Sequence, residues 1–250
     1  MGAIIHYMNA SVKTKNVCEF YVKRKTSIQN ICEFYALAHK LKNILRTGWK
    51  LWKVDAERFE SVAEHVYGAQ MLAIGIVSEF DLKLDLPKVI MMLAIHDLAE
   101  VIVGDIPATG SPVTPEQKHK MELDAIIKIL APLANGDKIL KLWKEYEEKK
   151  TPEAKFTALV DKFEGTMQCK FYDEAGQCNF DRVCTPAVEA KKNIGRARGI
   201  NSMSELWFTQ DSEKFGYDKD FDGLFAQIAE FAKKKKIFTP QCKGGVIPPL

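Results

Sequence analysis

A histidine followed by an aspartate inside a strongly apolar run is the feature of this sequence most suggestive of chemistry. His96 and Asp97 directly follow the apolar residues 89–95. Burying both side chains costs free energy unless each finds a partner. Because successive residues of a helix turn by about 100°, Glu100 lies on the same face as His96. Three polar groups on one side of an apolar helix favour a functional site, with a hydrogen-bonded core pair of His and Asp as the alternative.

Two more residues could complete a metal site with this pair. His65 lies near the start of an earlier predicted helix, and Asp161 follows the apolar residues 158–160 of a later one. Two imidazoles and two carboxylates from three helices suit a divalent cation and leave positions for water. A shell of nitrogen and oxygen without thiolate argues against a closed structural zinc site. We therefore expect one divalent ion, which could be Mn, Co, Fe, Ni, Zn or Mg because such shells are permissive.

Helix start signals surround the candidate ligands. Ser61 and Glu64 form a capping-box pattern at the start of the helix that carries His65. Residues 89–103 are too apolar for a surface helix, and they are followed by three prolines in the predicted loop 107–115. Helical spacing dominates the chain and no set of alternating runs bounded by hairpin turns appears. The predicted fold class is all-α.

Composition narrows the class of protein. Hydrophobic residues make up 46% and charged residues 28% of the 250 residues, as expected for a folded globular chain. The net charge of +3 is small and the only dense basic run is 233–236, which argues against a nucleic-acid polymer as partner. No apolar run approaches the roughly 18 residues of a membrane span, and the six cysteines form no CxxC pair. We expect a cytoplasmic protein without a membrane partner.

The sequence around the ligands resembles a known family beyond the ligand spacing itself. Residues 96–107 have the sequence His-Asp-Leu-Ala-Glu-Val-Ile-Val-Gly-Asp-Ile-Pro, which resembles the motif of the HD-domain 5′-deoxynucleotidases. Residues 60–65, Glu-Ser-Val-Ala-Glu-His, are similar to the lead-in to the first ligand of that subgroup. The resemblance covers roughly residues 36–200 and identifies the chain as a member of the HD-domain metal-dependent phosphohydrolases.

This resemblance implies a helical bundle around one metal ion, frequent dimerisation and release of the 5′-phosphate from deoxyribonucleoside monophosphates. The expected protein is therefore a homodimer with a nucleotide substrate. The resemblance also implies that Glu100 and Asp105 act in catalysis or substrate contact, and that Arg46 and Trp49 contact or shape the nucleotide pocket. Structural roles remain as alternatives: an anchor for a ligand histidine for Glu100, a turn cap for Asp105, and packing for Arg46 and Trp49.

Three segments and two competing functions follow from these patterns. We expect an N-terminal extension with helical character at 1–35, an HD phosphohydrolase domain at 36–200, and a C-terminal extension at 201–250 that packs on the domain. One competing function is hydrolysis of another nucleotide phosphate ester by an HD domain. The other is a non-catalytic nucleotide-sensing or scaffold protein that keeps the metal for stability.

Overall fold

The computed structural model describes residues 15–217, 219 and 221–237 of the chain. Within these residues every regular element is a helix, and the predicted all-α class is confirmed. Residues 45 and 61 form an isolated antiparallel bridge. The first half of the chain contains α1 (Lys15–His39), η1 (Lys40–Asn43), α2 (Thr47–Leu51), α3 (Val62–Glu79), α4 (Leu86–Ile95), α5 (Glu100–Val103) and α6 (Pro115–Leu130). The second half contains α7 (Gly136–Glu148), α8 (Pro152–Glu174), α9 (Pro186–Ala197), α10 (Met203–Phe215), η2 (Phe221–Gly223) and α11 (Leu224–Lys234).

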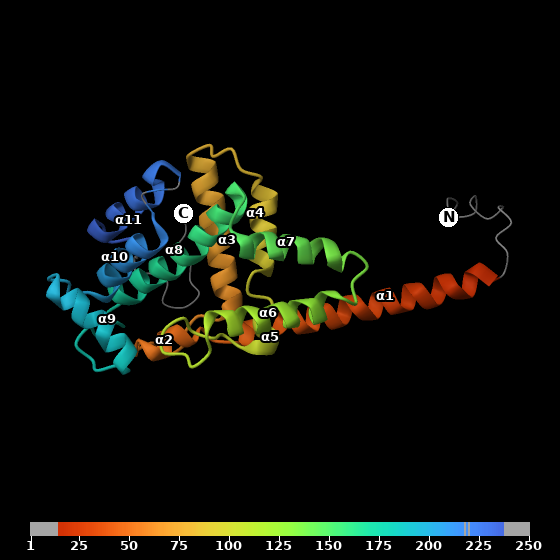
Figure 1. Cartoon of the computed structure of the whole chain (residues 1–250), viewed down its shortest axis with the longest axis horizontal. Helices are drawn as coiled ribbons and strands as arrows, with labels where there is room; N and C mark the ends of the chain where they lie inside the picture. The colour runs from red at the N-terminus through yellow and green to blue at the C-terminus, as the bar shows by residue number, and fades with distance from the viewer. Residues whose placement is uncertain (1–14, 218, 220, 238–250) are drawn as a thin grey trace, which may run out of the picture.

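Helix α8 organises the body of the molecule. It packs against α3, α4, α7 and α10, and Figure 1 shows it running through the body between the amino- and carboxyl-terminal helices. The largest apolar cluster joins α3, α4, α8, α10 and α11, with Phe156, Phe163 and Phe208 fully buried in it. Because these apolar residues surround α8 over much of its length, the polar residues on it are held in fixed positions.

The helices that carry the candidate ligands begin as the sequence predicts. The Ser61 hydroxyl accepts a hydrogen bond from the Glu64 N–H, and the Glu64 carboxylate accepts one from the Ser61 N–H at 2.7 Å. This capping box fixes the first turn of α3, in which His65 lies. The Thr151 hydroxyl caps α8 in the same way by accepting from the Ala154 N–H at 3.3 Å.

The apolar run 89–103 does not form one continuous helix. Helix α4 ends at Ile95, residues 96–99 form a tighter turn, and α5 starts at Glu100. In this turn the backbone hydrogen bonds span three residues, with the Leu98 N–H donating to the Ile95 carbonyl at 3.1 Å. A tight segment of this kind inside an α-helix often marks a functional hinge or a sequence under strain, and here it contains both His96 and Asp97.

The two ends of the described chain differ in how they pack. Helix α1 projects away from the body, with only its carboxyl-terminal part lying alongside α6 (Figure 1). Helices α10 and α11 lie on the body, since α10 packs on α8 and α11 packs on α10. Among the described residues, no helix combines the length and the apolar composition that crossing a bilayer would require.

The capping box makes a testable contribution to stability. Substituting Ser61→Ala removes the hydroxyl cap, and we expect the free energy of unfolding to fall by about 1 kcal/mol. Urea denaturation followed by circular dichroism measures this change. The control is Ser78→Ala, at an exposed position near the end of the same helix, which should leave stability nearly unchanged. Equal midpoints for the two variants would show that the cap contributes nothing.

Candidate metal centre and active-site cavity

The four candidate metal ligands lie together in the folded chain. The Nε2 atom of His65 on α3 lies 3.2 Å from Oδ1 of Asp161 on α8 and 3.8 Å from Oδ2 of Asp97. The Nε2 atom of His96 lies 3.1 Å from the same Asp97 oxygen and 3.7 Å from Asp161 Oδ1. Ligands about 2.1 Å from one ion, at tetrahedral or octahedral angles, are separated by roughly 3.0–3.4 Å. The separations of 3.1 and 3.2 Å lie in this range and those of 3.7 and 3.8 Å are wider. His65, His96 and Asp97 form a group that could hold a metal ion, and Asp161 lies beside it.

Both imidazoles are oriented through their other ring nitrogen. The Nδ1–H of His96 donates to the Leu93 carbonyl at 2.7 Å, and Nδ1 of His65 contacts the Glu164 carboxylate. Partners of this kind hold a metal-binding histidine in one orientation and one tautomer. In each ring Nε2 is thus the atom left for an ion.

Two of the four ligating atoms are buried without a hydrogen bond. Among the described residues, Nε2 of His96 and Oδ2 of Asp97 have no hydrogen-bond partner, although they lie only 3.1 Å apart. The two atoms are close enough for a hydrogen bond, but the angles at them do not allow one. Two buried polar atoms that lie close together without a hydrogen bond can both coordinate one ion between them, and a cation would satisfy both.

Asp161 has further partners that fix its carboxylate. The Tyr146 hydroxyl on α7 donates to Oδ2 at 3.0 Å, and the Lys162 ammonium donates to the same oxygen at 2.8 Å. Oδ1 is left facing the two imidazoles. Burial alone would raise the pKa of Asp161, but Lys162 and the imidazoles hold that pKa well below its usual value. The residue is therefore present as a carboxylate, the form that binds a metal.

Glu100 borders the same site, but its pKa is shifted in the opposite direction from that of Asp161. Its side chain is buried, and its Oε2 atom has no hydrogen-bond partner among the described residues. Burial raises the pKa of Glu100 well above its usual value, and the charges of Asp97 and Asp105 raise it further. A carboxyl group in such surroundings can hold a proton near neutral pH and release or accept it during a reaction.

Arg46 is a second cation beside the candidate ligands, in addition to Lys162. Its Nη1 atom lies 3.7 Å from Asp97 Oδ2, and its Nε atom lies 3.9 Å from Glu60 Oε1. Burial lowers the pKa of Arg46, but Asp97, Asp105, Glu60 and Asp161 more than offset this and keep it charged. Its side chain remains 23% exposed, so the guanidinium can reach a ligand as well as the carboxylates.

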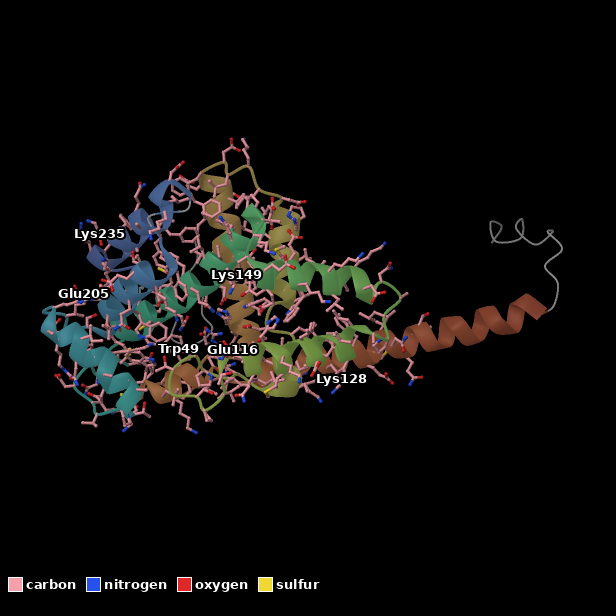
Figure 2. All side chains as sticks on the ribbon, in the orientation of Figure 1. Trp49, Glu116, Lys128, Lys149, Glu205 and Lys235 are labelled. Carbon is pink, nitrogen blue, oxygen red and sulfur yellow. The ribbon has the colours of Figure 1, made fainter. Side chains whose placement is uncertain are left out.

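Asp105 and Trp49 lie beside the site, and their contacts hold α2 in place. The Asp105 carboxylate accepts from the Thr47 N–H at 2.5 Å and from the Thr47 hydroxyl at 2.9 Å. Trp49, labelled in Figure 2, is 1% exposed, and its indole N–H donates to Glu60 at 2.9 Å. Both residues border the cavity described next, and both also position the turn that carries Arg46.

A cavity of about 270 Å³ opens next to the candidate ligands. Arg46, Asp97, Glu100 and Asp161 border one end of it, and residues of α10 border another part. The candidate ligands, the buried acid and the arginine therefore face one common space that a small molecule can enter.

Comparison with known proteins assigns this arrangement to a family. The model of the HD domain matches residues 38–202, which contain all of the candidate ligands. The chain belongs to the HD-domain family. It is 36% identical over 140 residues to the 5′-deoxynucleotidase HDDC2 of Danio rerio, covering 55% of this chain and 67% of that protein. It is 37% identical over 142 residues to the protein of the same name in Dictyostelium discoideum, covering 54% and 73%.

Solved structures support the same fold. A conserved hypothetical protein from Pyrococcus furiosus aligns with a TM-score of 0.54 and 22% identity, over 82% of this chain and 99% of that one. A predicted metal-dependent phosphohydrolase from Magnetospirillum magnetotacticum aligns with the same TM-score and identity, over 84% and 96%. At this level of identity the likeness establishes the fold of the HD domain alone.

Three residues around the site are not apparent from the sequence analysis. Glu164 lies three residues after Asp161 on one helix, so this spacing could have indicated it as the partner of a ligand. Tyr146 and Trp207 come from α7 and α10. They reach the site through tertiary packing, and no local pattern marks either of them.

The contact between Glu164 and His65 predicts a measurable effect on metal affinity. Substituting Glu164→Gln keeps the size of the side chain but removes the charge that orients the imidazole, and we expect the affinity for Mn²⁺ or Co²⁺ to fall about 10- to 100-fold. Competition with a chelator measures this affinity. The control Glu79→Gln changes an exposed carboxylate at the end of α3 and should bind the ion as the unmodified protein does. Unchanged affinity in Glu164→Gln would contradict this role.

Proposed function

We propose that this protein is a metal-dependent phosphohydrolase that releases phosphate from deoxyribonucleoside 5′-monophosphates. The observation that carries the proposal is the meeting of four metal-ligating side chains beside a buried, unpaired carboxyl group, Glu100, at one end of a cavity. The relatives named 5′-deoxynucleotidase support the choice of substrate.

In this proposal His65, His96, Asp97 and Asp161 hold one divalent ion. When bound, such an ion neutralises charge on a phosphoryl group and makes water a better nucleophile near neutral pH. The protein's own contribution is to hold two imidazoles and two carboxylates in fixed directions. Glu164 and the Leu93 carbonyl fix the imidazoles, and Tyr146 together with Lys162 fixes Asp161.

Glu100 and Arg46 supply the remaining chemistry. A phosphate monoester carries charge that repels a nucleophile, so hydrolysis needs a nearby cation and a group that moves a proton. The Arg46 guanidinium can pair with the phosphate through two parallel hydrogen bonds. The raised pKa of Glu100 suits a group that takes a proton from water or gives one to the leaving oxygen. Asp105 and Trp49 hold α2 in place for Arg46, and direct substrate contact by either of them stays a prediction.

Finer properties remain predictions at this stage. The ion is one of Mn, Co, Fe, Ni, Zn or Mg, since a shell of histidine and carboxylate accepts several of these ions. The homodimer implied by the resemblance and the cytoplasmic location expected from the composition also remain predictions. Multi-angle light scattering on the purified chain tests the dimer.

Glu100 gives the decisive test of the proposed function. We expect the purified protein with Mn²⁺, Co²⁺ or Mg²⁺ to release phosphate from deoxyribonucleoside monophosphates. In Glu100→Gln, kcat should fall about 10²- to 10⁴-fold because the proton-transferring group is lost, while metal affinity stays close to that of the unmodified protein. Phosphate release from a panel of deoxyribonucleotides and ribonucleotides measures both activity and selectivity.

The matched control is Glu116→Gln, which changes an exposed carboxylate at the start of α6 (labelled in Figure 2) and should keep full activity. If Glu100→Gln is as active as the unmodified protein, Glu100 is not the proton-transferring group. If the unmodified protein binds the ion but hydrolyses none of the nucleotides, the proposed function is wrong and a non-catalytic role replaces it.

A further inference from the structure

Helix α3 contains a glycine one turn after the candidate ligand His65. Gly68 lies well inside this helix, which runs from Val62 to Glu79 and packs against α8. Residues three apart are neighbours on a helix surface, so Gly68 and His65 lie on the same side of α3. Glycine inside a helix is destabilising relative to alanine. The reason for a glycine at this position must therefore lie in what packs against it.

The space beside Gly68 is filled by the side chain of Glu164 from α8. A Cβ atom built on Gly68 would lie 2.5 Å from Oε1, 3.2 Å from Cδ and 3.4 Å from Cγ of Glu164. Ordinary van der Waals contact of a Cβ atom begins at about 3.4 Å, and real Cβ atoms essentially never approach another atom to less than 3.0 Å. The three nearest atoms all belong to Glu164, so a methyl group at position 68 would first displace this carboxylate.

The displaced carboxylate would be the one that orients a candidate metal ligand. Oε2 of Glu164 contacts Nδ1 of His65, and both residues are buried. Little room is left on the side of Glu60, because one oxygen of Glu60, one of Glu164 and a ring nitrogen of His65 lie within 4.8 Å of one another. Neighbouring carboxylates repel when both are charged. The Glu164 carboxylate is thus confined between His65, Glu60 and Gly68, and a shift away from Gly68 would alter its contact with the imidazole.

A second glycine of the same helix has different surroundings. Gly75 lies two turns after Gly68 and is exposed. A Cβ atom built on Gly75 would have nothing within 4 Å in the described part of the chain, apart from its own helix backbone and its two chain neighbours. A methyl group fits at Gly75 without moving another residue. The two glycines therefore differ in whether a carboxylate lies against them.

We infer that Gly68 is a positioning residue of the candidate metal centre, because the absence of a side chain there leaves the space from which Glu164 orients His65. The inference rests on the proposed function in that it takes His65 as a ligand of the ion. With Nδ1 held by Glu164, Nε2 of His65 lies 3.2 Å from Asp161 Oδ1. Gly68 contributes no ligand atom and acts only through Glu164.

The test measures the affinity for Mn²⁺ by competition with a chelator in the absence of nucleotide. Gly68→Ala should lower this affinity about 10- to 100-fold, the loss expected when the partner of a metal-binding histidine is disturbed. Gly75→Ala is the matched control, since it makes the same substitution in the same helix, and it should bind Mn²⁺ as the unmodified protein does. Metal-free Gly68→Ala should still unfold cooperatively in urea, because the end of a flexible glutamate side chain moves at little cost.

A second background separates the effect of Glu164 from a general effect of the methyl group. Glu164→Ala removes both the carboxylate and the close contact, so adding Gly68→Ala to it should cause no further loss of Mn²⁺ affinity. A further loss by the same factor would overturn the inference, because the glycine would then act independently of Glu164. If Gly68→Ala alone fails to fold, recovery of folding in the double variant supports the inference, and a double variant that is also unfolded overturns it.

Two other results would contradict this role of Gly68. One is a Gly68→Ala variant that binds Mn²⁺ as tightly as the unmodified protein, and the other is an unmodified protein that binds no Mn²⁺. Because nucleotide is absent, the outcome does not depend on phosphate release. A protein whose Mn²⁺ affinity requires Gly68 but which hydrolyses none of the nucleotides would support this inference and contradict the proposed function.

Discussion

The structure depends on the compensation of buried charge where α3, the turn after α4 and α8 meet. Asp97, Asp161 and Glu164 come within contact distance of two buried imidazoles there, and Arg46 lies beside them. Carboxylates gathered in a low-dielectric interior are unfavourable unless cations and donors are equally close. The protein's own cations surround the site, but the central atoms of His96 and Asp97 are left without a hydrogen bond. A divalent ion would satisfy both atoms, while burial, together with the charges of Asp97 and Asp105, keeps the pKa of Glu100 high.

The apolar clusters explain how such a site can be held in place. One cluster packs α8 against α3, α4, α10 and α11, and a second packs α6 and α7 against the turn that carries His96 and Asp97. Between them α8 presents both Asp161 and Glu164, so one helix provides one candidate ligand and the partner of another, His65. Movement of α8 would therefore disturb the imidazole of His65 as well as Asp161. Rigid packing on both sides is what makes the metal geometry possible.

The parts of this site that depend on local sequence patterns can be predicted from the sequence. The capping box at Ser61, the cap at Thr151 and the His96–Asp97 pair within an apolar run are all local, and the structure contains each of them. The tight turn at 96–99 cannot be predicted from the hydrophobic periodicity. Backbone hydrogen bonds that span three residues and those that span four both suit the same apolar spacing. Trp49 is also not predictable as a buried residue, since its burial is produced by Trp207 and Tyr172 from distant helices.

The lining of the cavity comes from two parts of the chain. The part with the candidate metal ligands is built from residues within the HD-domain match. Another part of the lining comes from α10, after the match ends. Asp211 accepts a hydrogen bond from Thr166 on α8, the helix that also carries Asp161, and Trp207 stacks on Trp49 beside α2. Substitutions on α10 therefore act on the candidate metal ligands and Arg46 through α8 and α2, as well as on the lining of the cavity.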